Sequence, residues 1–175
     1  MNYFELYDIP VTFEVNTDAV KRKFYELSKK YHPDFFINES KEKQEEILEL
    51  STLNNKAYHV LSHPLRRIEY ILKLHDLIAE GDKYQLPQSF LMEMMDINEA
   101  LMELQFETDY TLLEKVKTQI DETEAALFDE LHGYTKQFDA NADGDSESIL
   151  LKIRDIWYRQ KYLLRIRESL NKFVL

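Results

Sequence analysis

Apolar residues recur at helical spacing through most of the chain, and no stretch alternates between apolar and polar residues as a half-buried strand does. One clear stripe runs from Val20 through Phe24 and Leu27 to Tyr31. Pro33 ends that helix, because proline disfavours helical geometry in the residue before it. The pattern predicts an all-α protein. We expect helices over residues 3–7, about 18–31, 41–61, 64–77, 87–106, 109–138 and from about 146 to the C-terminus.

Short polar residues mark where several of these helices begin. Thr17 or Asp18 is the expected cap of the second helix, and Ser40 or Lys41 is where the third helix starts. Thr108 and Asp109 precede the long sixth helix and are its expected capping residues, because their side-chain oxygens can accept from free backbone N–H groups of the first turn. Residues 139–145 are rich in Asp, Asn and Gly and are predicted to form the loop before the last helix.

Charge is unevenly distributed along the chain. The sequence has 33 acidic and 22 basic side chains, a formal net charge of -11. Residues 1–75 carry 11 basic and 12 acidic side chains, residues 76–147 carry 4 and 19, and residues 148–175 carry 7 and 2. Two explanations are open: the basic last helix folds back against the acidic middle, or the exposed helix faces simply carry charge, since single surface ion pairs are weak.

The change in charge near residue 76 coincides with a loop at residues 80–87, which contains Gly81 and ends at Pro87. Together they predict a domain boundary. We expect an N-terminal domain over residues 1–75, a junction over 76–87 and a C-terminal three-helix bundle over 88–175.

Composition excludes several classes of function. The chain has no cysteine, which excludes disulfides, thiolate catalysis and cysteine-ligated metal centres. No apolar run approaches the roughly 20 residues that cross a membrane. The N-terminus lacks the features of a signal or transit peptide, so a cytoplasmic protein is expected. Neither a cofactor nor a metal is expected. The acidic balance also argues against nucleic acid as a partner.

The tripeptide His32-Pro33-Asp34 lies between two predicted helices. Proline fixes its own φ angle, so the turn is stiff and holds Asp34 as an outward acceptor for a partner's arginine. His32 is expected to hydrogen-bond within the turn. On the preceding helix, an exposed stripe is predicted opposite the core face: Arg22, Tyr25 and Lys29.

This combination resembles the J domain of DnaJ-type co-chaperones over residues 1 to about 75. The resemblance rests on four segments: Tyr3-Phe4-Glu5-Leu6, Leu27-Ser28-Lys29-Lys30-Tyr31, His32-Pro33-Asp34 and Asn55-x-Ala57-Tyr58-x-x-Leu61. It implies an antiparallel helical hairpin with short flanking helices. It also implies that His32, Pro33 and Asp34, with Arg22, Tyr25 and Lys29 beside them, engage a DnaK-like chaperone and stimulate its ATPase. The hydrolysis would belong to the partner, so this chain is not expected to be an enzyme.

The predicted helix over residues 87–106 has two apolar bands. One is a core-facing stripe of Phe90, Met94, Ile97, Leu101 and Leu104. The other is rich in methionine and comprises Leu91, Met92, Met95 and Met102, with Asp96 and Glu99 beside it. Two explanations of the second band remain open from the residues alone: the last helix covers it as core, or a partner binds it.

The segment from Ser62 to Tyr70, followed by that from Phe90 to Glu99, resembles the HscB family of co-chaperones for iron–sulfur cluster assembly. The Gly/Phe-rich and Cys-rich modules of general DnaJ-type proteins are absent. The resemblance implies two partners, an HscA-type chaperone and an IscU-type iron–sulfur scaffold. The implied scaffold contacts are Leu91, Met92, Met95, Asp96, Glu99 and Tyr158. Met95 and Tyr158 differ from the leucine and phenylalanine that are familiar in the family.

Other functions are considered beside this one. A J-type co-chaperone for a different client would have the same N-terminal half. A helical metalloenzyme would use His59 and His63, but the glutamate that a zinc protease needs after the first histidine is missing. Nucleic-acid binding would use the basic residues of the last helix, which are Arg154, Arg159, Lys161, Arg165 and Arg167.

Overall fold

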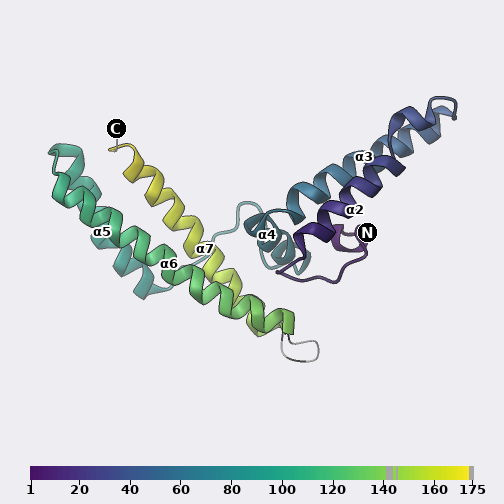
Figure 1. The fold of residues 1–175 in the computed structure, drawn as a ribbon. Helices are drawn as coiled ribbons and strands as arrows, with labels where there is room; N and C mark the ends of the chain where they lie inside the picture. Colours follow the sequence, from purple (N-terminus) through teal and green to yellow (C-terminus); the bar gives the residue numbers. More distant parts are fainter. Residues whose placement is uncertain (141–143, 145, 174–175) are drawn as a thin grey trace. The chain divides into compact units, whose positions relative to one another are not determined.

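A computed structural model describes residues 1–140, 144 and 146–173, and every regular element in that part of the chain is a helix (Figure 1). The predicted all-α class is therefore confirmed. The chain divides into two compact units, residues 1–76 and 77–175. The elements are α1 (Tyr3–Leu6), α2 (Thr17–Lys30), η1 (Pro33–Phe36), α3 (Lys41–Leu61), α4 (Pro64–Leu74), α5 (Gln88–Phe106), α6 (Tyr110–Ala140) and α7 (Ser146–Asn171).

The N-terminal unit is built on an antiparallel hairpin of α2 and α3, to which the short helices α1 and α4 are added (Figure 1). Phe24 of α2 stacks on Tyr58 of α3 with ring centroids 4.3 Å apart. The apolar periodicity of each helix explains the packing, because the stripe on one helix is buried against the stripe on the other. The buried apolar residues of α2 and α3 are Val20, Leu27, Ile47, Ala57 and Leu61.

Helix ends differ from the expectation at several places. The cap of α2 is Asn16, whose side chain accepts from the backbone N–H of Ala19, rather than Thr17 or Asp18. α4 ends at Leu74 instead of near residue 77, because Asp76 has a φ of 55° in the left-handed region, which a helix cannot continue through.

At the start of α6, Asp109 accepts from the N–H of Leu112, as expected of a cap. α6 continues to Ala140, and residues 141–143 and 145 of the predicted loop lie outside the described residues.

A buried polar network joins α1, α2 and α3. The side chain of Asn54 is 1% exposed. Its Oδ1 accepts from the Tyr7 hydroxyl at 2.8 Å, and its Nδ2 donates to the Phe24 carbonyl and the Ser28 hydroxyl, each at 3.1 Å. A buried amide with three partners fixes the register of the hairpin, because any shift would leave these groups without hydrogen bonds.

We predict that Asn54→Ala lowers the free energy of unfolding of the N-terminal unit by about 2–3 kcal/mol, because it leaves buried partner groups unsatisfied. Denaturation followed by circular dichroism measures this change. Trp157 is the only tryptophan and lies in the C-terminal unit, so its fluorescence transition should stay in place. The control is Asn55→Ala, at the exposed neighbouring position. Equal stability of the two variants would contradict the role assigned to the network.

The C-terminal unit packs α5, α6 and α7 against one another, with the long helices α6 and α7 side by side (Figure 1). Arg167 of α7 reaches Asp121 at 2.7 Å and Glu124 at 2.9 Å on α6. Arg159 of α7 reaches Glu130 of α6 at 3.3 Å. The explanation in which the basic last helix folds back against the acidic middle is confirmed at these two arginines. The two arginines hold α7 in register against α6. Both helices pack against α5, which carries the methionine band.

Candidate functional site

The turn after α2 is held by its own hydrogen bonds. Pro33 opens the single 3₁₀ turn of η1, where a missing N–H has no cost. The backbone N–H of Asp34 donates to His32 Nδ1 at 3.3 Å, and that of Phe35 donates to the His32 carbonyl at 3.1 Å. His32 therefore does hydrogen-bond within the turn, as expected. The Asp34 side chain is 80% exposed, so the turn presents a carboxylate to solvent.

The predicted stripe on α2 is also exposed. Arg22 and Lys29 lie at the surface, and the Tyr25 side chain is 55% exposed. Neighbouring Lys23 is neutralised by Asp8 at 2.9 Å, and this contact raises the Lys23 pKa, chiefly through the hydrogen bond. Within the described residues, neither Arg22 nor Lys29 has an acidic partner, so both charges are available to a negatively charged surface.

On α5, one band is buried and the other is exposed. The predicted core stripe is buried throughout, at Phe90, Met94, Ile97, Leu101 and Leu104. The second band is exposed by 37% at Leu91, 64% at Met92, 58% at Met95 and 60% at Met102. The last helix does not cover this band, so the explanation of it as core is wrong. Because apolar side chains gather on the free face of one helix, α5 has the character of a protein-binding surface.

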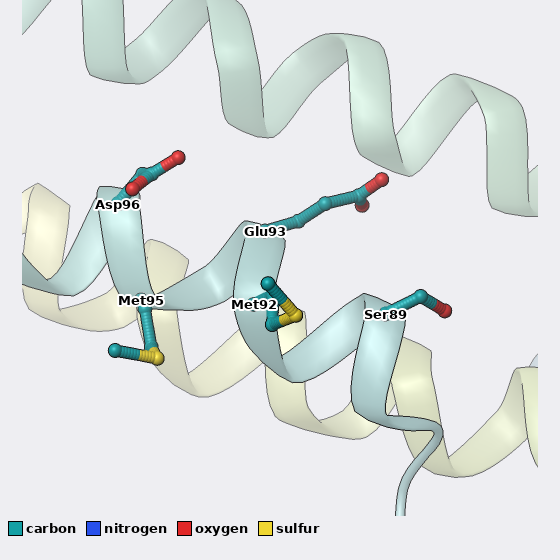
Figure 2. Close-up of a pocket in the computed structure, with 5 residues that line it drawn as sticks. All are labelled: Ser89, Met92, Glu93, Met95 and Asp96. Carbon is teal, nitrogen blue, oxygen red and sulfur yellow. The ribbon is translucent and has the colours of Figure 1, made fainter.

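Figure 2 shows the start of this face, where five residues of α5 line an open depression of about 480 Å³. Met92 and Met95 project from the front of the helix, whereas Glu93 and Asp96 point toward the α6 ribbon above. Methionine side chains are flexible and adapt to the shape of a partner. The carboxylates at the edge add a preference for basic groups on that partner.

Tyr158 of α7 lies in a different environment from the α5 band. Its ring stacks on Tyr84 of the segment before α5, with centroids 4.2 Å apart and planes within 4°. Its hydroxyl donates to Asp82 at 3.4 Å. Apart from an edge-on contact with its neighbour Trp157, the described contacts of Tyr158 are with the segment leading into α5, and none of them is with Leu91 or Met92. The sequence could not predict this pair, because the segment has no periodicity.

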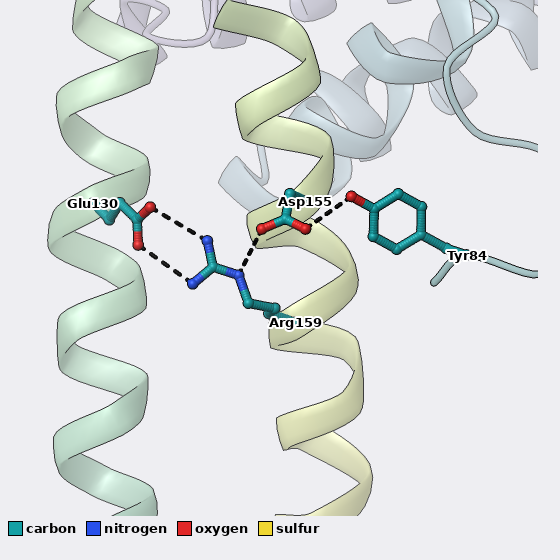
Figure 3. Close-up of polar contacts among 4 residues, drawn as sticks. All are labelled: Tyr84, Glu130, Asp155 and Arg159. Atoms are coloured by element: carbon teal, nitrogen blue, oxygen red, sulfur yellow. Dashed lines mark hydrogen bonds and ion pairs between the residues drawn. The ribbon is translucent and has the colours of Figure 1, made fainter. Parts of the chain in front are cut away.

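A chain of polar contacts fixes the segment before α5 to the bundle (Figure 3). The Tyr84 hydroxyl donates to Asp155 at 2.8 Å, and Arg159 donates from Nε to the same carboxylate at 2.8 Å. The Arg159 guanidinium also reaches Glu130 of α6. Tyr84 is therefore held by stacking on one side and by a charged acceptor at its hydroxyl.

We predict that the C-terminal unit loses stability above pH 10. Burial, then the hydrogen bond to Asp155, raises the pKa of Tyr84, and burial, then the charge of Asp82, raises the pKa of Tyr158. Groups with a raised pKa in the folded state contribute stability that is complete below the ordinary pKa of about 10 and is lost as the pH rises through the folded value. Denaturation followed by Trp157 fluorescence from pH 9 upward measures the loss. If the double variant Tyr84→Phe, Tyr158→Phe loses stability above pH 10 as steeply as the unmodified chain, then these two tyrosines are not the cause of the loss.

The alternative sites receive no support from the described residues. In that part of the chain, no group of three or more His, Asp or Glu residues is placed to hold a metal ion. His59 lies beside Arg66, with Nδ1 3.3 Å from the guanidinium. Two of the basic residues proposed for nucleic acid, Arg159 and Arg167, are engaged by carboxylates of the unit itself. Over the described residues, no helix is long and apolar enough to span a bilayer.

Comparison with known proteins shows which families the two halves of the chain match. The family model of the DnaJ domain matches residues 2–70, and that of the HSCB C-terminal oligomerisation domain matches residues 86–171. The solved structure of the chaperone HscB from Vibrio cholerae is 26% identical with a TM-score of 0.60, over 98% of this chain and 96% of that chain. The human co-chaperone HscB is 26% identical with a TM-score of 0.68, over 98% of this chain and 81% of that chain.

A DnaJ domain followed by a helical domain of this type defines a J-domain co-chaperone. Because both parts match and both solved structures align over nearly the whole chain, this protein belongs to the HscB family.

Proposed function

We propose that this protein brings an IscU-type iron–sulfur scaffold to an HscA-type DnaK-like chaperone and stimulates the ATPase of that chaperone. One observation carries the proposal: a single chain has two exposed surfaces of different chemistry, each on its own compact unit. The first is the carboxylate of Asp34 beside the basic stripe of α2. The second is the methionine band of α5, with the acidic side chains that flank it.

The N-terminal surface acts on the chaperone. Asp34 is an outward acceptor on a turn with its own hydrogen bonds, so little conformational entropy is lost when an arginine of the chaperone binds it. Arg22, Tyr25 and Lys29 add a basic and aromatic contact to an acidic surface beside that arginine. This contact favours the conformation in which the chaperone hydrolyses ATP, whereas the chemistry of hydrolysis stays in the chaperone.

The C-terminal surface holds the scaffold. Leu91, Met92 and Met95 supply the apolar contact, and Asp96 and Glu99 supply charge at its edge. Tyr158, the contact on α7 that the family resemblance implies, would be offered separately from the α5 band, from its position stacked on Tyr84 in the segment that leads into α5. Because one chain binds both proteins, the scaffold reaches the peptide site of the chaperone at a high effective concentration. The chaperone then closes on the scaffold, which assists transfer of the cluster to acceptor proteins.

The experiment is a steady-state ATPase assay of the cognate DnaK-like chaperone with this protein, the scaffold or both. We expect a modest increase with each alone and a rate with both that clearly exceeds the product of the separate increases. An unrelated client protein at the same concentration is the control. If the scaffold adds nothing beyond that client, then the chain serves another client and the scaffold part of the proposal is wrong.

A further inference from the structure

The exposed band of α5 continues for two turns beyond the proposed scaffold contacts. At about 100° per residue, four apolar side chains fall within about 60° of one another around the helix. Their exposure increases along the helix: 37% at Leu91, 58% at Met95, 60% at Met102 and 87% at Phe106. We call these four residues the α5 stripe. The individual scaffold contacts named above on α5 end at Glu99, so no contact has yet been proposed for the side chains of Met102 and Phe106.

The whole α5 stripe is long enough for a specific protein interface, whereas the part of it up to Glu99 is short for one. From Leu91 to Glu99 the helix rises about 12 Å, whereas from Leu91 to Phe106 it rises about 22 Å. A specific interface buries about 800 Å² on each partner, which a patch of one or two helical turns does not approach. An aromatic side chain exposed by 87% at the end of such a stripe is also the type of residue that anchors interfaces.

Charge around the α5 stripe is one-sided. Going around the helix past Phe106, the next positions include Glu99, Glu103 and Asp96, all exposed. On the other edge lie Asn98 and Gln105, which carry no charge. A partner with an apolar ridge and basic residues along one side of that ridge fits this pattern. Because only one edge of the stripe is acidic, the ridge can lie along α5 in only one of its two directions and still bring its basic residues to the acidic edge. The basic residues that a second copy could offer lie mainly in residues 148–175, where Arg159 and Arg167 are already paired with carboxylates of α6, so the scaffold is the occupant that we argue for.

We infer that the scaffold contacts the whole α5 stripe, with Met102 and Phe106 forming a second apolar anchor beyond the methionine depression of Figure 2. This inference rests on the proposed function, because it extends the same surface along the same helix. The partner surface is an apolar ridge about 22 Å long. Its basic side chains face Glu99 and Glu103, on one edge of the stripe.

Calorimetric titration of the full chain with the purified scaffold tests this inference. We expect Phe106→Ala to raise the Kd about tenfold and Met102→Ala to raise it somewhat less, since large exposed anchors dominate binding. The control is Phe128→Ala, which removes a phenylalanine of α6 that is 61% exposed and should leave the Kd unchanged. Because Met102 and Phe106 are both exposed, neither substitution should change stability, and the unfolding transition of each variant, followed by Trp157 fluorescence, should match that of the unmodified chain.

The outcomes separate this inference from the proposed function. If Leu91→Ala with Met92→Ala weakens scaffold binding but Phe106→Ala does not, then the extension is wrong and the proposed function stands. If neither variant weakens binding, then the scaffold does not bind α5 at all. Sedimentation velocity without scaffold tests the remaining occupant. A dimer that Phe106→Ala dissociates, together with unchanged scaffold affinity, would assign the end of the stripe to a second copy and overturn the inference.

Discussion

Asp34→Asn is expected to abolish stimulation of the chaperone ATPase, reducing it by at least about tenfold, while scaffold affinity stays the same. Asparagine keeps the shape of the side chain but loses the charge, and a hydrogen bond between charged groups is worth about 1.5–3 kcal/mol. The turn itself should survive, because its hydrogen bonds involve the backbone N–H of Asp34 and the ring of His32. The measurement is single-turnover ATP hydrolysis by the chaperone.

The matched control for this variant is Asp18→Asn. Asp18 is an exposed aspartate in the first turn of α2, within the same unit, and its loss costs at most about 1 kcal/mol of helix stability. If Asp34→Asn stimulates as well as Asp18→Asn does, then the outward carboxylate is not what the chaperone recognises. Circular dichroism of both variants should overlay that of the unmodified chain.

Leu91→Ala combined with Met92→Ala is expected to weaken scaffold binding by about a hundredfold and to leave the basal effect of the N-terminal unit on the chaperone intact. Truncating two apolar side chains that become buried in a complex removes about 3 kcal/mol of favourable burial. Isothermal titration calorimetry measures the affinity. The scaffold-dependent part of the ATPase stimulation should disappear at scaffold concentrations that saturate the unmodified chain.

A matched double variant elsewhere on the C-terminal unit controls for loss of exposed apolar surface. Leu151→Ala with Phe128→Ala removes side chains that are 39% and 61% exposed, close to the 37% and 64% of Leu91 and Met92. Scaffold affinity should be unchanged in this control. Equal weakening by both double variants would mean that the scaffold does not recognise the α5 face in particular.

Periodicity predicted α5 well because each apolar residue of a helix belongs to one face. It separated the buried stripe containing Phe90 from the exposed band containing Met92. Whether a second apolar band is core or surface cannot be read from one helix, because that depends on where the neighbouring helices pass. The structure supplies this information by placing α6 and α7 over the other face.

Positions that depend on backbone conformation or on distant contacts were less predictable. Asn16, Thr17 and Asp18 are all good capping residues, and only the backbone decides which one is the cap. Asp76 adopts a left-handed conformation that its sequence context does not indicate, so the end of α4 was placed too late. The stacking of Tyr84 on Tyr158 joins residues far apart in the chain and leaves no periodic signal.

The central claim is that one chain must hold both partners at once, and a mixing experiment tests it most directly. The Asp34→Asn chain keeps the scaffold surface, and the Leu91→Ala, Met92→Ala chain keeps the chaperone surface. Both are added together to the chaperone and the scaffold, at concentrations where each variant sediments as a single chain. We predict that the mixture gives no more ATPase stimulation than the second variant alone. Recovery of the full synergy seen with the unmodified chain would contradict the claim.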